Sequence, residues 1–215
     1  MASPLLTLLV NPNAFFSRDS SEWEALRVPA LIVLAAALIA GATAILTMDL
    51  MAGIMPPDVQ QYQGAFLILG IVGQIAWILV FWAIWAGVFT VVSLFFQGKG
   101  PFGRTLAVTG YGHLPLVIGS VISLAMLSVF IPDISVPAVN TVEEIQAASI
   151  ALMHHPVMMF SGIMGMIFLL WAANIWIFGI RYARAISLRN AAITVGVPVA
   201  LYLIFTLWSL AGMPL

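Results

Sequence analysis

Residues 65–96 read AFLILGIVGQIAWILVFWAIWAGVFTVVSLFF, thirty-two consecutive positions without a charged side chain. A helix needs about 20 apolar residues to cross a hydrocarbon layer about 30 Å thick. Four further uncharged runs, each at least that long, occupy residues 28–48, 105–131, 156–180 and 191–211. The sequence therefore predicts an all-α, polytopic membrane protein built as a bundle of five transmembrane helices.

The run at residues 65–96 is longer than one crossing requires. As a single helix it would extend about 48 Å, which exceeds the hydrocarbon thickness even with a tilt of about 40°. We expect part of it to leave the hydrocarbon or to break. The glycine-containing start, from Gly64 to Gly73, is the expected place for such a break.

Composition places the whole chain in the membrane and excludes several classes of protein. Of the 215 residues, 63% are hydrophobic and 7% are charged, against about 45–50% and 25% in soluble domains. Residues 28–215 are expected to form one transmembrane domain, preceded by residues 1–27. The absence of cysteine excludes disulfides and thiol catalysis. The net charge of −1 gives no reason to expect nucleic acid as a partner, so the lipid bilayer is the expected partner.

The charged residues predict the orientation of the bundle. Basic residues occur only before the first run, between the second and third, and between the fourth and fifth; they are Arg18, Arg27, Lys99, Arg104, Arg181, Arg184 and Arg189. The other loops carry acidic residues, namely Asp49, Asp58, Asp133, Glu143 and Glu144. Short basic loops stay on the cytoplasmic side. We expect a multi-pass protein of the cell membrane with a cytoplasmic N-terminus and an external C-terminus.

The first 27 residues are expected to form an amphipathic segment in the headgroup region. Leucines at positions 5, 6, 8 and 9 precede the polar stretch Asn11–Asn13, and Phe15 and Phe16 follow it. Ser21 and Glu24 have the spacing of a capping box, which predicts a helix start before the first span. Thr141 and Glu144 have the same spacing and predict a short helix in the outer loop.

Polar side chains within the apolar runs are the candidate functional residues, because an unpaired polar group in a bilayer costs free energy. They are Gln74, Tyr111, His113 and Asn174. Counted inward from the basic loops, His113 and Asn174 lie at similar depths, so they could meet. Two interpretations stay open: the cluster lines a path for a solute or proton, or its members hold helices together by hydrogen bonds. The lack of a second ionisable side chain in mid-membrane favours the second interpretation.

Other chemistry finds little support in the sequence. His154 and His155 are adjacent, which is not the spacing of zinc ligands on a helix, and neither a G-x-S-x-G nor an H-E-x-x-H motif occurs. We expect no cofactor, no metal and no catalysis. Small residues four apart, as in Ala37 with Gly41, can bring helices together within the monomer, and a homodimer is the less favoured alternative.

Several short motifs together resemble the Yip1 domain family. They are Pro12, Phe15 and Phe16; Gly98, Lys99 and Gly100 followed by Phe102, Arg104 and Thr105; Gly110 and Tyr111 followed by Leu114 and Pro115; and Trp171, Gly179, Ile180, Arg181, Ala185, Ile186, Ser187 and Ala191. The resemblance covers most of the chain. It implies five spans with the N-terminus in the cytosol.

The resemblance also implies a function class. Eukaryotic members of the family are associated with Rab GTPases and with traffic between the endoplasmic reticulum and the Golgi. This sequence does not contain their Asp-Leu-Tyr-Gly-Pro motif and is more similar to the short prokaryotic members. The expected function is non-enzymatic: to organise membranes or membrane-protein partners through the cytoplasmic loops. The alternative is a transporter or channel for a small solute or ion, with Tyr111, His113 and Asn174 in its path.

Overall fold

The computed structural model describes residues 3–48, 50, 55, 57–131, 134, 139 and 141–210, and every regular element among them is a helix. Among the acidic positions expected outside, Asp49 and Asp133 lie beyond the described residues. The helices of the apolar runs are α3 (Arg27–Leu46), α6 (Gln63–Leu94), α7 (Phe102–Tyr111), α8 (His113–Phe130), α10 (Pro156–Ala183) and α11 (Leu188–Leu210). The other helices are α1 (Pro4–Val10), α2 (Pro12–Phe16), the 3₁₀ turn η1 (Ser20–Glu22), α5 (Pro57–Gln60) and α9 (Val142–Met153).

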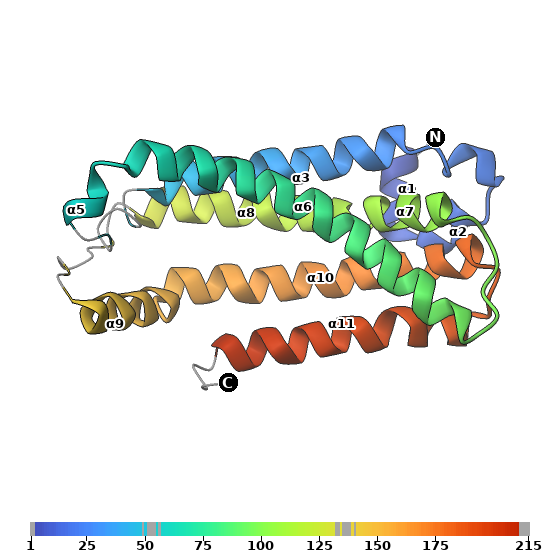
Figure 1. The fold of residues 1–215 in the computed structure, drawn as a ribbon. Coiled ribbons are helices and arrows are strands. Elements are labelled where there is room, and N and C mark those ends of the chain that lie inside the picture. Colours follow the sequence, from blue (N-terminus) through green and yellow to red (C-terminus); the bar gives the residue numbers. More distant parts are fainter. Residues whose placement is uncertain are drawn as a thin grey trace.

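Five segments of the described chain are long and apolar enough to cross a membrane, with α7 and α8 together forming one of them. The predicted fold class is therefore confirmed. The second span does not break, because α6 continues without interruption from Gln63 to Leu94 through Gly64, Gly70 and Gly73. The alternative, that part of this helix leaves the hydrocarbon, stays a prediction. Figure 1 shows α6 crossing the bundle obliquely, an orientation that shortens the projection of a long helix along the bundle.

The bundle has two chemically different ends. Figure 1 shows α1, α2, the α6–α7 turn and the α10–α11 turn together at one end, with α5 and α9 at the other. Every Lys and Arg residue of the chain lies in this first group or in the directly adjoining segment after α2 and helix ends of α3, α7, α10 and α11. We call this part of the molecule the basic end, defined by Arg18, Arg27, Lys99, Arg104, Arg181, Arg184 and Arg189. Three segments that lie far apart in the sequence thus form one face of the molecule.

Helix α7 lies centrally at the basic end, in contact with α3, α6 and α10. The core around it is aromatic: Trp176, Phe16 and Phe89 are almost completely buried, and Trp176 packs 5.3 Å from the ring of Trp85. A second, smaller cluster lies at the other end, where Leu127 of α8 meets Leu152 of α9. The larger core therefore stabilises the end that carries the basic residues.

The N-terminal segment forms two helices that pack against the bundle. Leu8, Phe15 and Phe16 are buried in the main core, whereas Leu6 and Val10 are exposed. The indole nitrogen of Trp171 donates to the carbonyl of Leu9 at 3.2 Å. One face of the segment is therefore buried against the bundle, and its expected place in the headgroup region stays a prediction.

One of the two predicted capping boxes forms. Thr141 and Glu144 each bond the other's backbone N–H at 3.2 Å and start α9. The box predicted at Ser21 and Glu24 is wrong. Ser21 lies in η1, which Asp19 caps, and α3 begins without a side-chain cap.

Candidate functional site at the basic end

The third span is interrupted within the motif from Gly110 to Pro115. Helix α7 ends at Tyr111, Gly112 forms the junction, and α8 begins at His113. Pro115 has no N–H, so the carbonyl of Tyr111 lacks the donor that a continuous helix would place four residues later. The expected span 105–131 is therefore two helices joined at the residues singled out from the sequence.

The side chain of His113, the first residue of α8, forms a hydrogen bond close to this junction. Its side chain is 4% exposed, and Nδ1 lies 2.8 Å from the carbonyl oxygen of Thr109. The indole nitrogen of Trp176, on α10, donates to the same carbonyl at 3.0 Å. A carbonyl can only accept, so the hydrogen bond requires the His113 proton to be on Nδ1. The imidazole thus helps to join α7, α8 and α10.

Asn174 does not join this group. It is exposed on α10, and no hydrogen bond links it to His113 among the described residues. Trp176, two residues further along, contacts His113 in its place. Two residues correspond to about 3 Å of rise and about 200° of rotation, so Trp176 and Asn174 lie on different faces of α10, and the expected contact between Asn174 and His113 does not form.

The other two polar residues also lie apart from His113. Tyr111 is buried against the N-terminal segment, with its ring 5.1 Å from Phe15. Gln74 is exposed on α6 and lines a groove of about 320 Å³ with Thr43 and Ser161. The structure therefore separates the four residues of the expected cluster into four different surroundings.

Glycines at the junction permit close contact between helices. A Cβ at Gly110 would lie 2.6 Å from Cβ of Pro29 and 3.2 Å from the Trp82 ring. A Cβ at Gly112 would overlap the indole of Trp176. The family-like motif at Gly110, Tyr111, Leu114 and Pro115 is therefore the place where α3, α6 and α10 approach the third span.

Arg184 has a role that the sequence analysis did not identify. It was assigned to a basic cytoplasmic loop, but it is 3% exposed. Its guanidinium donates to Ser93 Oγ at 2.9 Å, to the Gly98 carbonyl at 3.0 Å and to the Gly100 carbonyl. Burial lowers the pKa of Arg184 from its usual range. We call this group the Arg184 clamp; it joins the α6–α7 turn to the end of α10.

The close contact between the α6–α7 turn and the end of α10 accounts for the glycine at position 100. The Lys99 N–H donates to the Arg184 carbonyl at 2.8 Å, which completes the contact from the other direction. Gly100 has a φ of +130°, and a Cβ there would overlap the Ala183 carbonyl oxygen. Only glycine fits this position.

Two further basic residues are bonded to the N-terminal segment. Arg104 donates to Glu24 at 2.8 Å and to Ser20 at 3.2 Å. Arg181 donates to the Asn13 side chain at 3.4 Å, and the Tyr182 hydroxyl donates to the same oxygen at 2.9 Å. Lys99 and Arg189 are exposed. The basic residues therefore divide into a bonded group that assembles the end and an exposed group at its surface.

Sequence reasoning missed Trp176 and Thr109 because both are ordinary residues in an apolar helix. One signal could have indicated them. A proline four residues after Tyr111 predicts a break in the helix, and side-chain donors often bond backbone carbonyls close to a break. The carbonyl that is bonded here is that of Thr109, two residues before Tyr111. The nearest donors are His113 in the motif and an indole on the neighbouring helix.

Comparison with known proteins agrees with the motifs described above. The family model for the Yip1 domain matches residues 6–210. An uncharacterized protein of the archaeon Methanocaldococcus jannaschii is 33% identical over 120 residues, which cover 56% of this chain and 85% of the relative. No solved structure matches the chain.

Proposed function

Because the chain belongs to the Yip1 domain family, we propose that it is a non-enzymatic protein of the cell membrane that organises membranes or membrane-protein partners through its basic end. The basic end faces the cytoplasm in this proposal, since positive charge in short loops is retained there. The N-terminus is then cytoplasmic and the C-terminus external.

The proposal is supported by the hydrogen bonds that hold separate segments of the chain together at the basic end. The Arg184 clamp holds the α6–α7 turn on α10, and the pair of Arg104 with Glu24 holds the N-terminal segment on α7. A loop that served only to set topology would need none of these contacts. The bonds of Arg184 are buried, whereas the pair of Arg104 with Glu24 is partly exposed. Buried polar bonds keep neighbouring segments in one arrangement, and a pre-organised surface binds a partner at lower entropic cost.

The surface of this end combines apolar and cationic side chains. Phe95 is 82% exposed at the end of α6, and Phe102 and Leu188 are also exposed. Lys99 and Arg189 are exposed beside them in the sequence. Aromatic residues and cations are enriched where proteins meet partners or anionic membrane surfaces. The surface is thus suited to contact another membrane protein or the bilayer.

Photo-crosslinking in intact cells tests the proposal. A photoreactive amino acid replaces Phe95 or Lys99 at the basic end, and Val142 or Glu143 at the other end as matched exposed controls. We expect discrete protein or lipid adducts from the basic-end positions. The same adduct pattern from all four positions would contradict the proposal, because it would show that neither end has preferred partners.

A further inference from the structure

The N-terminal segment encloses a cavity of about 410 Å³ at the basic end. Its lining comes from α1, α2, the segment around η1, the start of α3 and the end of α7. The lining residues are Ser3, Pro4, Leu5, Phe15, Arg18, Glu22, Trp23, Val28 and Tyr111. The volume is within the range of pockets that hold small ligands, and an apolar wall with a few polar groups is typical of them.

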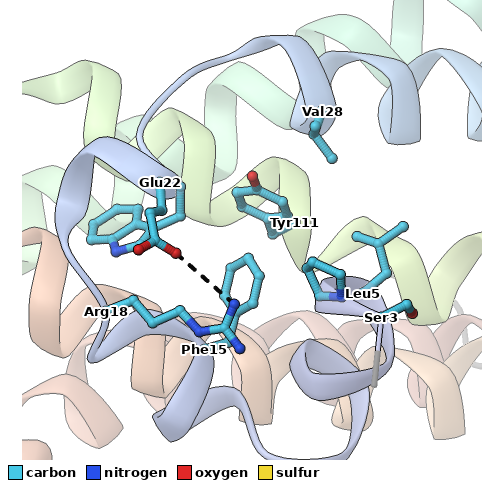
Figure 2. Close-up of a pocket in the computed structure, with 9 residues that line it drawn as sticks. Ser3, Leu5, Phe15, Arg18, Glu22, Val28 and Tyr111 are labelled. Carbon is cyan, nitrogen blue, oxygen red and sulfur yellow. Dashed lines mark ion pairs between the residues drawn. The ribbon is translucent and has the colours of Figure 1, made fainter. Parts of the chain in front are cut away.

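The polar and apolar groups of the cavity are separated. Figure 2 shows Arg18 and Glu22 on one side, Leu5 on the other, and Tyr111 between Phe15 and Val28. Leu5 and Val28 are partly exposed, and Val28 lies in the first membrane-spanning segment. One part of the rim is thus apolar while the opposite part carries charge, which is the arrangement that an amphiphile requires.

Two hydrogen-bond donors in the lining have spare capacity. The Trp23 side chain is 2% exposed, and its indole N–H has no partner among the described residues. A buried donor without an acceptor costs about 1–3 kcal/mol. The Tyr111 hydroxyl also belongs to the lining. Both are groups that bond well to the ester and phosphate oxygens of lipids at the interface between headgroups and hydrocarbon.

The cation at the rim is available to an anion. Arg18 Nη1 lies 4.0 Å from Glu22 Oε2, at the outer limit of an ion pair, and the two side chains are 38% and 59% exposed. Pairs of this kind contribute little to stability. The guanidinium also lies 5.8 Å from the centre of the Phe15 ring, which holds it over the cavity wall. A phosphate can therefore replace the carboxylate at small cost.

We propose that this cavity binds a membrane phospholipid, with one acyl chain between α1 and α3 and the phosphate at Arg18. The ligand source is the bilayer, because the apolar rim opens where Leu5 and Val28 meet hydrocarbon. The site is distinct from the partner surface at Phe95 and Lys99. It makes the N-terminal segment a lipid-binding element, and it requires only that the basic end lie at a membrane surface.

Photoactivatable lipids test the site in reconstituted full-length protein. The probe is phosphatidylglycerol with a diazirine in one acyl chain, and labelled peptides are located by mass spectrometry. We expect enrichment on the peptides that contain Leu5, Val28 and Tyr111. Val28→Trp fills the cavity and should lower this labelling severalfold, while Leu38→Trp, at an exposed position further along α3, should leave it unchanged. Equal labelling of the cavity in both variants would overturn the proposal.

Separate substitutions test the proposed contact between the lipid phosphate and Arg18. Arg18→Gln should lower cavity labelling about fivefold, and Arg27→Gln, at an exposed cation outside the lining, should not change it. Diacylglycerol with the same diazirine should label the wild-type cavity as weakly as phosphatidylglycerol labels the Arg18 variant. Strong labelling by diacylglycerol would overturn the assignment of phosphate to Arg18. Because Arg18 is on the surface, its variant remains informative if Val28→Trp does not fold.

Discussion

The indole nitrogen of Trp176 on α10 donates to the carbonyl of Thr109 on α7 at 3.0 Å, and this bond crosses the gap that Gly112 leaves open. His113 donates to the same carbonyl from the start of α8 at 2.8 Å. One backbone oxygen thus connects three helices at the place where the third span is interrupted.

Gly112→Ala should destabilise the bundle. The backbone at Gly112 has a φ of −67°, which alanine adopts easily, so the only cost is overlap with the Trp176 indole. Overpacking of this kind costs about 1–3 kcal/mol. Thermal unfolding in detergent measures the effect. Gly165→Ala is the control, because a Cβ there meets nothing within 4 Å; an equal loss in both variants would show that the indole contact is unimportant.

His113 and Asn174 should act independently. In a double-mutant cycle with His113→Leu and Asn174→Leu, the free energies of unfolding should add within about 0.5 kcal/mol, because Asn174 is exposed on another face of α10. His113→Leu and Trp176→Phe should instead be coupled, since both donate to Thr109. Coupling in the first cycle and additivity in the second would contradict the observed geometry.

Arg184→Gln should weaken the whole basic end. The substitution removes donors from the Gly98 and Gly100 carbonyls and from Ser93, and buried acceptors left without donors cost about 1–3 kcal/mol each. We expect a loss of about 3 kcal/mol or more in the free energy of unfolding. Arg189→Gln, an exposed arginine in the same turn, should change it by less than about 0.5 kcal/mol. Similar losses in the two variants would argue against the clamp.

Reconstituted protein should conduct neither protons nor small solutes above the background of empty vesicles. His113 is bonded to backbone, and it lines neither the cavity beside Tyr111 nor the groove beside Gln74. A pH-dependent dye inside the vesicles measures proton flux. His113→Gln keeps a hydrogen-bonding side chain without the titratable ring. A flux that wild type shows and this variant lacks would establish transport and contradict the proposed function.

The features that the sequence predicted correctly are those that depend on the length of the apolar runs and on the positions of the charged residues. The five spans follow from uncharged runs such as residues 65–96, and the gathering of basic loops at one end follows from their alternation. The capping box at Thr141 and Glu144 was predicted because its bonds are local. The capping box predicted at Ser21 and Glu24 did not form, because Glu24 accepts a hydrogen bond from Arg104, eighty residues away, instead of capping a helix.

The details of the candidate site depended on helix rotation, which sequence depth does not determine. Counting residues placed Asn174 close to the level of His113, but packing turned Trp176 toward it. Arg184 looked like its neighbour Arg189 in the sequence, and only the fold of the Gly98–Gly100 turn buries one and exposes the other. Which side chain faces a neighbour is decided by contacts between segments far apart in the chain.

Cysteine accessibility in cells distinguishes a cytoplasmic basic end from an external one. The chain contains no cysteine, so single cysteines can replace Lys99, Arg189 and Glu143, which are all exposed. A membrane-impermeant maleimide is applied to intact cells and then to permeabilised cells. We predict labelling of Glu143→Cys in intact cells, and labelling of Lys99→Cys and Arg189→Cys only after permeabilisation. Labelling of Lys99→Cys and Arg189→Cys in intact cells, with Glu143→Cys protected, would contradict the account.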